Sequence, residues 1–122
     1  MKKILFAIKG KVIKGNQRGR NLGFPTANIK FSQNIVEGIY ISKVKINKDT
    51  FNAITFIGAA KTFNDVDINA ESYILDFNCD IYGIEIEISL LKKIRDNKKF
   101  NSEKELIEIM NKDLEKAREY FE

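Results

Sequence analysis

Ile84-Glu85-Ile86-Glu87-Ile88-Ser89-Leu90 is the stretch that decides the fold class. Its aliphatic residues alternate with glutamate or serine, which is the period of a strand with one face in a core and the other in water. We therefore expect the aliphatic side chains to be buried and the two glutamates to be solvated and structurally incidental.

Less regular versions of the same period occur upstream, where further strands are expected. The predicted strands cover 3–13, 39–47, 51–58 and 71–79. Asn47-Lys48-Asp49 is a turn-forming cluster that joins the second and third of these strands. Asp80-Ile81-Tyr82-Gly83 predicts a hairpin turn before the strand quoted above.

After residue 101 the apolar period changes from that of a strand to that of a helix. Ser102-Glu103-Lys104-Glu105 has the pattern of a capping box. The apolar residues that follow at helical spacing are Leu106, Ile107, Met110, Leu114, Ala117 and Phe121. A helix over 102–121 should cover an open side or end of the sheet. Antiparallel strands followed by one helix favour a mainly β fold, a small closed or nearly closed barrel with a C-terminal helix.

The length and composition favour one cytoplasmic domain. With 122 residues, the chain is expected to form a single domain over 1–122. No apolar run approaches the roughly 18 residues of a membrane span. Lys9 and Lys11 end the opening apolar stretch too early for a signal peptide. A single cysteine forbids an internal disulfide and fits a reducing compartment.

The chain contains no histidine, which restricts the chemistry open to it. Together with the single cysteine, this excludes histidine–cysteine zinc sites and Ser-His or Cys-His nucleophile pairs. Any catalytic base must therefore be a carboxylate, a lysine or a tyrosine.

Positive charge is concentrated in the first part of the chain. Residues 1–36 hold eight Lys and Arg residues and no acid, whereas residues 49–87 hold eight acids and Lys61 as their one base. This asymmetry indicates an anionic partner for the first segment. Solvated surface charge is the plainer explanation for Lys2, Lys3 and Lys30.

A glycine-rich segment is the candidate phosphate-binding loop. Its glycines allow backbone turns and let main-chain N–H groups approach an anion closely. They are Gly10, Gly15, Gly19 and Gly23, interleaved with Lys14, Arg18 and Arg20. The segment lacks the Gly-Lys-Ser/Thr of a Walker loop and the G-x-G-x-x-G of a dinucleotide-binding turn. On glycine spacing alone, a structural hairpin is the alternative.

Thr26 and Asn28 form a candidate metal-binding pair directly after Pro25. If Pro25 holds this stretch extended, the two side chains project from the same face. A hydroxyl and an amide carbonyl are hard, neutral oxygen donors of the kind that suits Mg²⁺. The alternative is that both side chains close their own turn.

Residues 10–29 read G-K-V-I-K-G-N-Q-R-G-R-N-L-G-F-P-T-A-N-I. This segment resembles the signature of the riboflavin kinase (flavokinase) family, which includes the kinase half of bacterial bifunctional FAD synthetases. The further matches are Gly38-Ile39-Tyr40, Ile57-Gly58, Thr62-Phe63, Glu71, the run from Tyr73 to Phe77, Asp80 to Gly83, Arg95 to Phe100, Asp113 and Ala117-Arg118. The resemblance implies a six-stranded antiparallel Greek-key barrel with a C-terminal helix, in agreement with the periods above.

The resemblance also implies the reaction, which is transfer of the ATP γ-phosphate to the 5′-hydroxyl of riboflavin to give FMN and ADP. Thr26 and Asn28 match the family's metal-binding pair, for Mg²⁺ or alternatively Mn²⁺ or Zn²⁺, and Glu71 matches its general base. The implied ATP-binding residues are Gly10, Lys14, Gly15, Arg18, Gly19, Arg20, Gly23, Pro25, Tyr82 and Gly83, and the implied flavin-binding residues are Arg95, Asn97 and Phe100. The expected partners are riboflavin and ATP, with no nucleic acid or membrane, for a monomer or a part of a larger FAD synthetase.

Glu71 also stands out without the resemblance. It heads a predicted strand face otherwise made of Tyr73, Leu75 and Phe77, so it should point toward the barrel interior or rim. A carboxylate there would be partly desolvated. The alternative is a strand-end glutamate turned to solvent.

Three features depart from the family pattern. Ala60-Lys61 stands where bacterial members usually have Arg-Pro, and a lysine offers no bidentate fork. Asn97 stands where the family often has glutamate, so the flavin segment has an amide in place of a charge. No nucleotidyltransferase domain precedes the motif, so this chain alone is not expected to make FAD.

Two other functions compete with the kinase. The departures at Ala60-Lys61 and Asn97 fit a degenerate flavin- or nucleotide-binding barrel that has lost turnover. The basic first segment fits a nucleic-acid-binding barrel, although such a barrel ordinarily carries surface aromatics among its basic residues. Phe6, Phe24 and Phe31 are instead placed like core or loop anchors.

Overall fold

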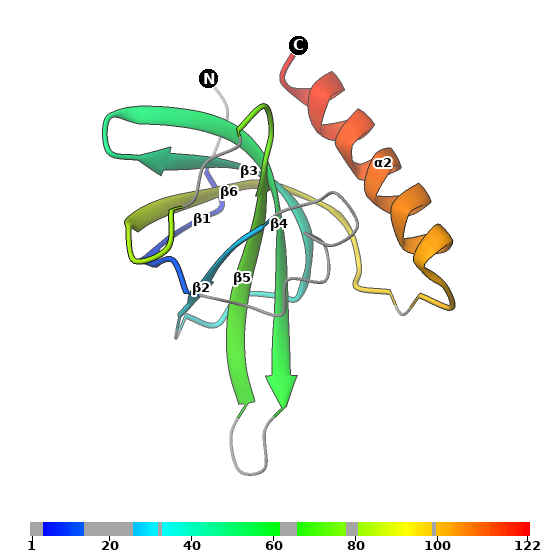
Figure 1. The fold of residues 1–122 in the computed structure, drawn as a ribbon, viewed down its shortest axis with the longest axis horizontal. Coiled ribbons are helices and arrows are strands. Elements are labelled where there is room, and N and C mark those ends of the chain that lie inside the picture. Colours follow the sequence, from blue (N-terminus) through cyan, green and yellow to red (C-terminus); the bar gives the residue numbers. More distant parts are fainter. Residues whose placement is uncertain (1–3, 14–25, 32, 62–65, 78–80, 99) are drawn as a thin grey trace.

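The computed structural model describes residues 4–13, 26–31, 33–61, 66–77, 81–98 and 100–122. In this part of the chain, six strands precede one long helix (Figure 1). The strands are β1 (Phe6–Lys11), β2 (Ala27–Lys30), β3 (Gly38–Ile46), β4 (Asp49–Lys61), β5 (Val66–Ile74) and β6 (Glu85–Arg95), and the helix is α2 (Glu103–Tyr120). None of the helical residues in these ranges forms a segment long and apolar enough to cross a membrane.

The six strands form one antiparallel sheet in the order β1-β6-β3-β4-β5-β2. Because β3, β4 and β5 follow one another and β6 returns beside β3, this order is a Greek key. The two edge strands then approach each other, and the Ile13 N–H donates to the Asn28 carbonyl at 2.7 Å. A Cβ on Gly10 would lie 3.3 Å from Ile29 Cβ, so a glycine permits this close approach of β1 and β2. The result is the nearly closed barrel expected from the sequence.

The barrel interior is mostly aliphatic, with Tyr40 and one group of three polar side chains among its buried residues. Three fully buried hydroxyls, those of Ser42, Thr55 and Ser72, lie on neighbouring strands. The Thr55 hydroxyl is 2.7 Å from each of the other two, so the three satisfy one another across β3, β4 and β5. The surrounding core includes Ile8, Ile29, Val44, Ile57, Ile86, Ile88 and Leu90.

The helix α2 lies against the outer surface of the barrel (Figure 1). Ala117 is fully buried there, and Leu114, Tyr120 and Phe121 pack with it against barrel residues of β3, β4 and the end of β5, namely Ile39, Ile41, Ile54 and Leu75. The predicted cap is confirmed, because the Glu105 N–H donates to Ser102 Oγ at 3.1 Å. The helix therefore covers a side of the sheet, as its apolar spacing predicted.

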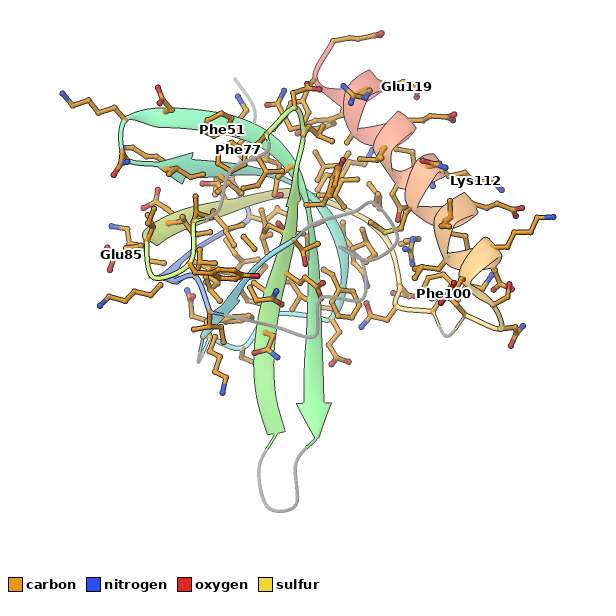
Figure 2. The ribbon with its side chains drawn as sticks, in the orientation of Figure 1. Phe51, Phe77, Glu85, Phe100, Lys112 and Glu119 are labelled. Carbon is orange, nitrogen blue, oxygen red and sulfur yellow. The ribbon has the colours of Figure 1, made fainter. Side chains whose placement is uncertain are left out.

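Three local predictions were wrong, concerning the end of a strand, a hairpin and the burial of Ile84. The strand predicted over 71–79 is β5, which ends at Ile74, and Asp76 adopts a left-handed φ of 57°. The chain then turns, so that Phe77 packs with Phe51 in the barrel cluster instead of continuing the Tyr73 face (Figure 2).

The turn before β6 is present but joins no hairpin, because β5 and β6 are not neighbours in the sheet. The turn bonds instead to the end of β1, where the Gly83 N–H donates to the Val12 carbonyl at 2.8 Å. Ile84 precedes β6 and is 36% exposed, so it lies outside the core that it was expected to join.

Candidate active site

Three residues predicted from the sequence, Thr26, Asn28 and Glu71, meet on the outer face of the barrel, where β2, β5 and β4 lie side by side. Asn28 is the register partner of Glu71, and Glu71 is in turn the register partner of Phe56. Directly paired residues of antiparallel strands share a face, so these side chains form a row across three strands. Ile13 extends the row by its bridge to Asn28. We call Ile13, Asn28, Glu71 and Phe56 the cross-strand row.

Thr26 is tied to this row by a hydrogen bond. Its hydroxyl donates to Glu71 Oε1 at 2.7 Å, across 45 residues of sequence. Glu71 is half-buried, whereas Asn28 is 7% exposed. The predicted metal pair and the predicted base thus lie together, and the Thr26 hydroxyl fixes one carboxylate oxygen.

The face that carries Glu71 differs from the one expected. Its neighbours Ala70 and Ser72 point into the barrel, so Glu71 and Tyr73 point outward, onto the side where α2 packs. Tyr73 and Leu75, the next residues on this face, pack in the cluster beneath the helix and do not line the interior. The predicted alternation of the two faces of β5 was correct. The barrel has two apolar surfaces, its interior and the outer patch beneath α2, and the sequence pattern does not distinguish them.

Phe56 was missed by the sequence analysis. It is 37% exposed although it is a large aromatic residue, and it is paired in register with Glu71. A Cβ on Gly58 would lie 2.4 Å from Phe56 Cε1, so the ring folds over the glycine backbone. Residues 53–57 alternate interior Ala53, Thr55 and Ile57 with outward Ile54 and Phe56, and because nearly all are apolar, the pattern gave no sign of an exposed ring.

The turn at Tyr82 and Gly83 lies next to the Ile13 end of the row. Val12, adjacent to Ile13, accepts from the Gly83 N–H and donates to the Ile84 carbonyl at 2.9 Å. Gly83 has a φ of +80° with nothing within 4 Å of a would-be Cβ, so its backbone conformation, not space, requires glycine. Tyr82 is 37% exposed beside it.

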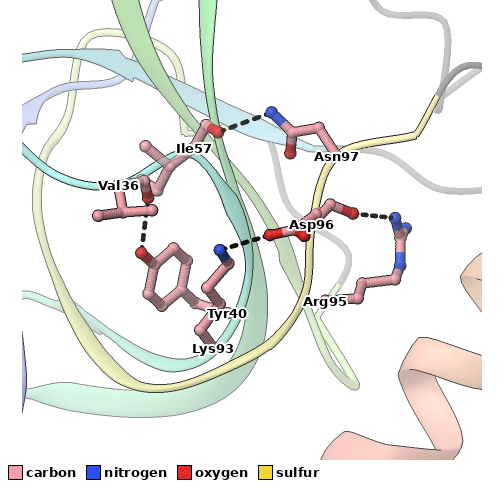
Figure 3. Close-up of polar contacts among 7 residues, drawn as sticks. All are labelled: Val36, Tyr40, Ile57, Lys93, Arg95, Asp96 and Asn97. Carbon is pink, nitrogen blue, oxygen red and sulfur yellow. Dashed lines mark hydrogen bonds and ion pairs between the residues drawn. The ribbon is translucent and has the colours of Figure 1, made fainter.

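The segment after β6 lies at the opposite end of the row. The Asn97 side-chain amide donates to the carbonyl of Ile57, the residue after Phe56, at 3.4 Å (Figure 3). Phe100 is half-buried and lies near the start of α2 (Figure 2). Of the three predicted flavin residues, Asn97 is therefore the one that a hydrogen bond places near the Phe56 end of the row.

Arg95, the third predicted flavin residue, is paired within the protein. Its Nη2 lies 2.8 Å from Asp113 Oδ2, and its Nε lies 3.0 Å from Asp113 Oδ1. Asp113 is 1% exposed in the middle of α2. In the sequence, Asp113 stands between Met110 and Ala117 on the apolar face of the helix. This position is the one feature of the sequence that indicates a buried acid in need of a partner.

Lys93 and Asp96 form a second ion pair beside Arg95, at 2.6 Å. This hydrogen bond lowers the pKa of the Asp96 carboxyl and raises that of the Lys93 ammonium, so both stay charged. Burial raises the pKa of the neighbouring Tyr40, which the positive charge of Lys93 opposes in part. Tyr40 is therefore a neutral donor, and its hydroxyl lies 2.6 Å from the Val36 carbonyl (Figure 3).

Several predicted ATP-binding residues lie outside the described ranges. They are Lys14, Gly15, Arg18, Gly19, Arg20, Gly23 and Pro25. The residues on either side of this segment, Ile13 and Thr26, do belong to the described part. Both lie at or next to the Ile13 end of the row. Gly10 has the packing role against Ile29 given above, and its predicted contact with ATP stays a prediction.

Residues 3–121 match the family model described as Flavokinase: Riboflavin kinase. The chain belongs to the riboflavin kinase family. The resemblance carried by the glycine-rich segment and the Pro-Thr-Ala-Asn block is thereby confirmed.

A curated relative and one solved structure carry the riboflavin kinase name, and a second solved structure with a different title shares the fold. A bifunctional riboflavin kinase/FMN adenylyltransferase of Bacillus subtilis is 38% identical over 122 residues, which cover 95% of this chain and 39% of the relative. The crystal structure of a riboflavin kinase from Trypanosoma brucei superposes with a TM-score of 0.65 at 26% identity, covering 93% of this chain and 78% of that one. A Streptococcus pneumoniae structure described as a macrolide-efflux protein has a TM-score of 0.86 at 35% identity, covering 92% of this chain and 38% of that one.

The chain spans only part of these curated relatives, between 18% and 39% of their lengths. Among the described residues, no group of three or more His, Cys, Asp and Glu could hold a metal ion.

Proposed function

We propose that this chain transfers the γ-phosphate of ATP to the 5′-hydroxyl of riboflavin, giving FMN and ADP. The observation that carries the proposal is the order of groups along the cross-strand row. The Tyr82-Gly83 turn lies at the Ile13 end, Asn28 and Glu71 lie in the middle, and the Asn97 segment lies beyond Phe56. Nucleotide, metal pair, base and flavin would follow one another in the order in which the reacting groups must meet.

Glu71 is proposed as the general base for the ribityl hydroxyl. With no histidine in the chain, a carboxylate is the natural proton acceptor at neutral pH. The bond from the Thr26 hydroxyl to Oε1 orients the carboxylate and leaves the other oxygen to accept the substrate proton. Phosphoryl transfer depends mainly on positioning and charge stabilisation, so an oriented base on a rigid sheet suits it.

Thr26 and Asn28 are proposed to hold a divalent cation, with Mg²⁺ as the first candidate. The fit rests on the oxygen atoms of the two side chains. The Thr26 hydroxyl uses its hydrogen in the bond to Glu71, so its lone pairs can still bind a cation. The Asn28 side-chain amide offers a neutral carbonyl oxygen. When bound, the ion would supply charge neutralisation at the phosphate oxygens. The backbone carbonyl of Asn28 accepts a hydrogen bond from the Ile13 N–H, and this bond holds β2 in place.

The exposed Phe56 ring is proposed as an apolar wall beside the base, and the Asn97 amide as a polar contact for the flavin. The Asn97 carbonyl oxygen does not take part in its bond to Ile57, in which the amide nitrogen donates. It is therefore available to accept from a ribityl hydroxyl or a ring N–H. This arrangement compensates in part for the missing acid at this position.

The direct test is incubation of the chain with riboflavin, ATP and Mg²⁺, followed by chromatography of the flavins. FMN is expected, with ADP formed alongside it, and no FAD, because adenylyl transfer is proposed to belong to the rest of the larger relatives. Tight flavin binding without ADP formation would instead favour a degenerate binding barrel. Oligonucleotide affinity with a steep dependence on salt would favour a nucleic-acid-binding barrel.

A further inference from the structure

Among the charged side chains whose burial the structure describes, only that of Asp113 is almost fully buried, at 1% exposed. A buried carboxylate is costly unless it is paired and hydrogen-bonded. Arg95 provides the partner through a two-nitrogen fork, with Nε 3.0 Å from Oδ1 and Nη2 2.8 Å from Oδ2. Because Arg95 is the last residue of β6 and Asp113 lies in the middle of α2, this pair fixes the helix to the end of the strand.

The third nitrogen of Arg95 reaches the chain that follows. Its Nη1 donates to the backbone carbonyl of Asp96 at 3.2 Å (Figure 3). Asp113 therefore holds the guanidinium, and the guanidinium holds the peptide between Asp96 and Asn97. A peptide unit is planar, so fixing its carbonyl also fixes the direction in which Asn97 leaves it. The Asp96 side chain is anchored separately, by Lys93.

Asn97 lies at the end of this series of contacts. Its amide bonds to the Ile57 carbonyl, next to Phe56 of the cross-strand row. By contrast, Thr26, Asn28 and Glu71 are held by the pairing of β2 with β5 and make no contact with Arg95 or Asp113 in the described structure. The two ends of the proposed site therefore have separate supports.

We infer that Arg95 and Asp113 are positioning residues for riboflavin: through the Asp96 peptide they set the position of Asn97, and Arg95 does not bind the flavin itself. The inference rests on the proposed riboflavin site. It assigns α2 a role in substrate affinity through the buried Asp113. It also predicts that riboflavin binding can be weakened while the phosphoryl-transfer groups stay intact.

The test compares riboflavin affinity and turnover in Asp113→Asn, Asn97→Ala and the double variant. Asp113→Asn keeps the shape of the side chain but removes the charge and one acceptor of the fork. Each single variant should raise the riboflavin KM about 3- to 10-fold, the cost of one lost hydrogen bond, with kcat and the ATP KM changed less than about twofold. If Asp113 acts through Asn97, the double variant should be no worse than the poorer single variant. Arg95→Lys, which keeps the cation but not the fork, should reproduce the effect of Asp113→Asn.

Arg118→Gln is the matched control, because Arg118 also links α2 to the barrel, through Asp76 at 3.5 Å on the surface. It should leave the riboflavin KM unchanged. Additive effects in the double variant, or equal losses in kcat and in both KM values, would show a general structural role and overturn the inference while the proposed function stands. If Asn97→Ala leaves riboflavin affinity unchanged, both the flavin site and the inference are wrong. If Asp113→Asn does not fold, Arg95→Lys decides alone, through the same split between the two KM values.

Discussion

Glu71 combines three properties that its sequence position alone does not give. It is half-buried, it accepts a 2.7 Å hydrogen bond from Thr26, and it is paired across the sheet with Asn28 on one side and Phe56 on the other. Each of these neighbours comes from a different strand or from the segment before β2. A single carboxylate therefore joins the proposed metal pair to the exposed aromatic ring.

Replacing this carboxylate should remove the base and little else. Glu71→Gln keeps the volume of the side chain and still accepts from Thr26, so folding and the binding of riboflavin and ATP should persist. Loss of a general base typically lowers kcat by about 10²–10⁴-fold. Steady-state kinetics with thermal melting would measure this, with Glu87→Gln, a surface residue paired with Lys9, as the control. Near wild-type turnover would make Glu71 structural.

The proposed metal pair should be separable from folding. In Asn28→Ala the backbone carbonyl that accepts from Ile13 remains, so the strand should persist. Activity should fall and be partly restored by higher Mg²⁺, and the melting temperature should move by less than about 4 °C, the shift expected for 1 kcal/mol. A titration of activity against Mg²⁺ measures the first effect. A large loss of stability with unchanged metal dependence would support the turn-closing alternative.

At the residue scale, the motif gave the identities of Thr26, Asn28 and Glu71, but not their surroundings. Phe56 was missed because both faces of β4 are apolar, so alternation could not mark the exposed ring. The partner of Arg95 was missed because it lies 18 residues away, in another element. Contacts of this kind depend on how α2 packs on the barrel, which no local pattern encodes.

Among the elements, α2 is held to the barrel by an apolar patch, one buried ion pair and one surface ion pair, and the contributions of the two ion pairs can be compared. Asp113→Ala leaves the Arg95 cation without its partner and should cost about 3 kcal/mol of unfolding free energy, the low end for a buried pair. Arg118→Ala breaks a surface pair and should cost less than about 1 kcal/mol. Urea unfolding measures both. Equal effects would mean that the buried pair contributes no more than the exposed one.

The start of β3 depends on a glycine. Gly38 has a φ of +154°, and a Cβ there would lie 2.9 Å from the Arg95 carbonyl and 2.5 Å from Lys93 Cε. Gly38→Ala should therefore cost about 1–3 kcal/mol, because the backbone of Arg95 must shift. Gly58→Ala meets only the movable ring of Phe56 and should cost less. Thermal melting of the two variants compares them, and an equally stable Gly38→Ala would contradict this account.

Most elements could be predicted from their periods, and their ends could not. The helix and its Ser102 cap matched the prediction closely, because a capping box is a local signal. β5 begins at Val66 and ends at Ile74, since pairing with β4 extends it backward and the left-handed Asp76 ends it. The turn at Tyr82-Gly83 was placed correctly, but its partner strand was wrong, because strand order is set by long-range pairing.

At the scale of the whole molecule, the Greek-key order brings the proposed site together. β2 and β5 are adjacent although about 40 residues separate Asn28 from Glu71 in the sequence, and β6 returns beside β3 to place the Asn97 segment near β4. The barrel class could be predicted from alternation followed by one helix. The cross-strand row could not, because it depends on the register of two strand pairs.

The central claim is that the cross-strand row transfers a phosphoryl group to riboflavin. The most direct measurement follows FMN and ADP together in one reaction with ATP and Mg²⁺, with and without riboflavin. Equal amounts of FMN and ADP are expected when riboflavin is present, and almost no ADP when it is absent. Riboflavin bound by the folded chain with no FMN formed, or ADP released at the same rate without riboflavin, would contradict it.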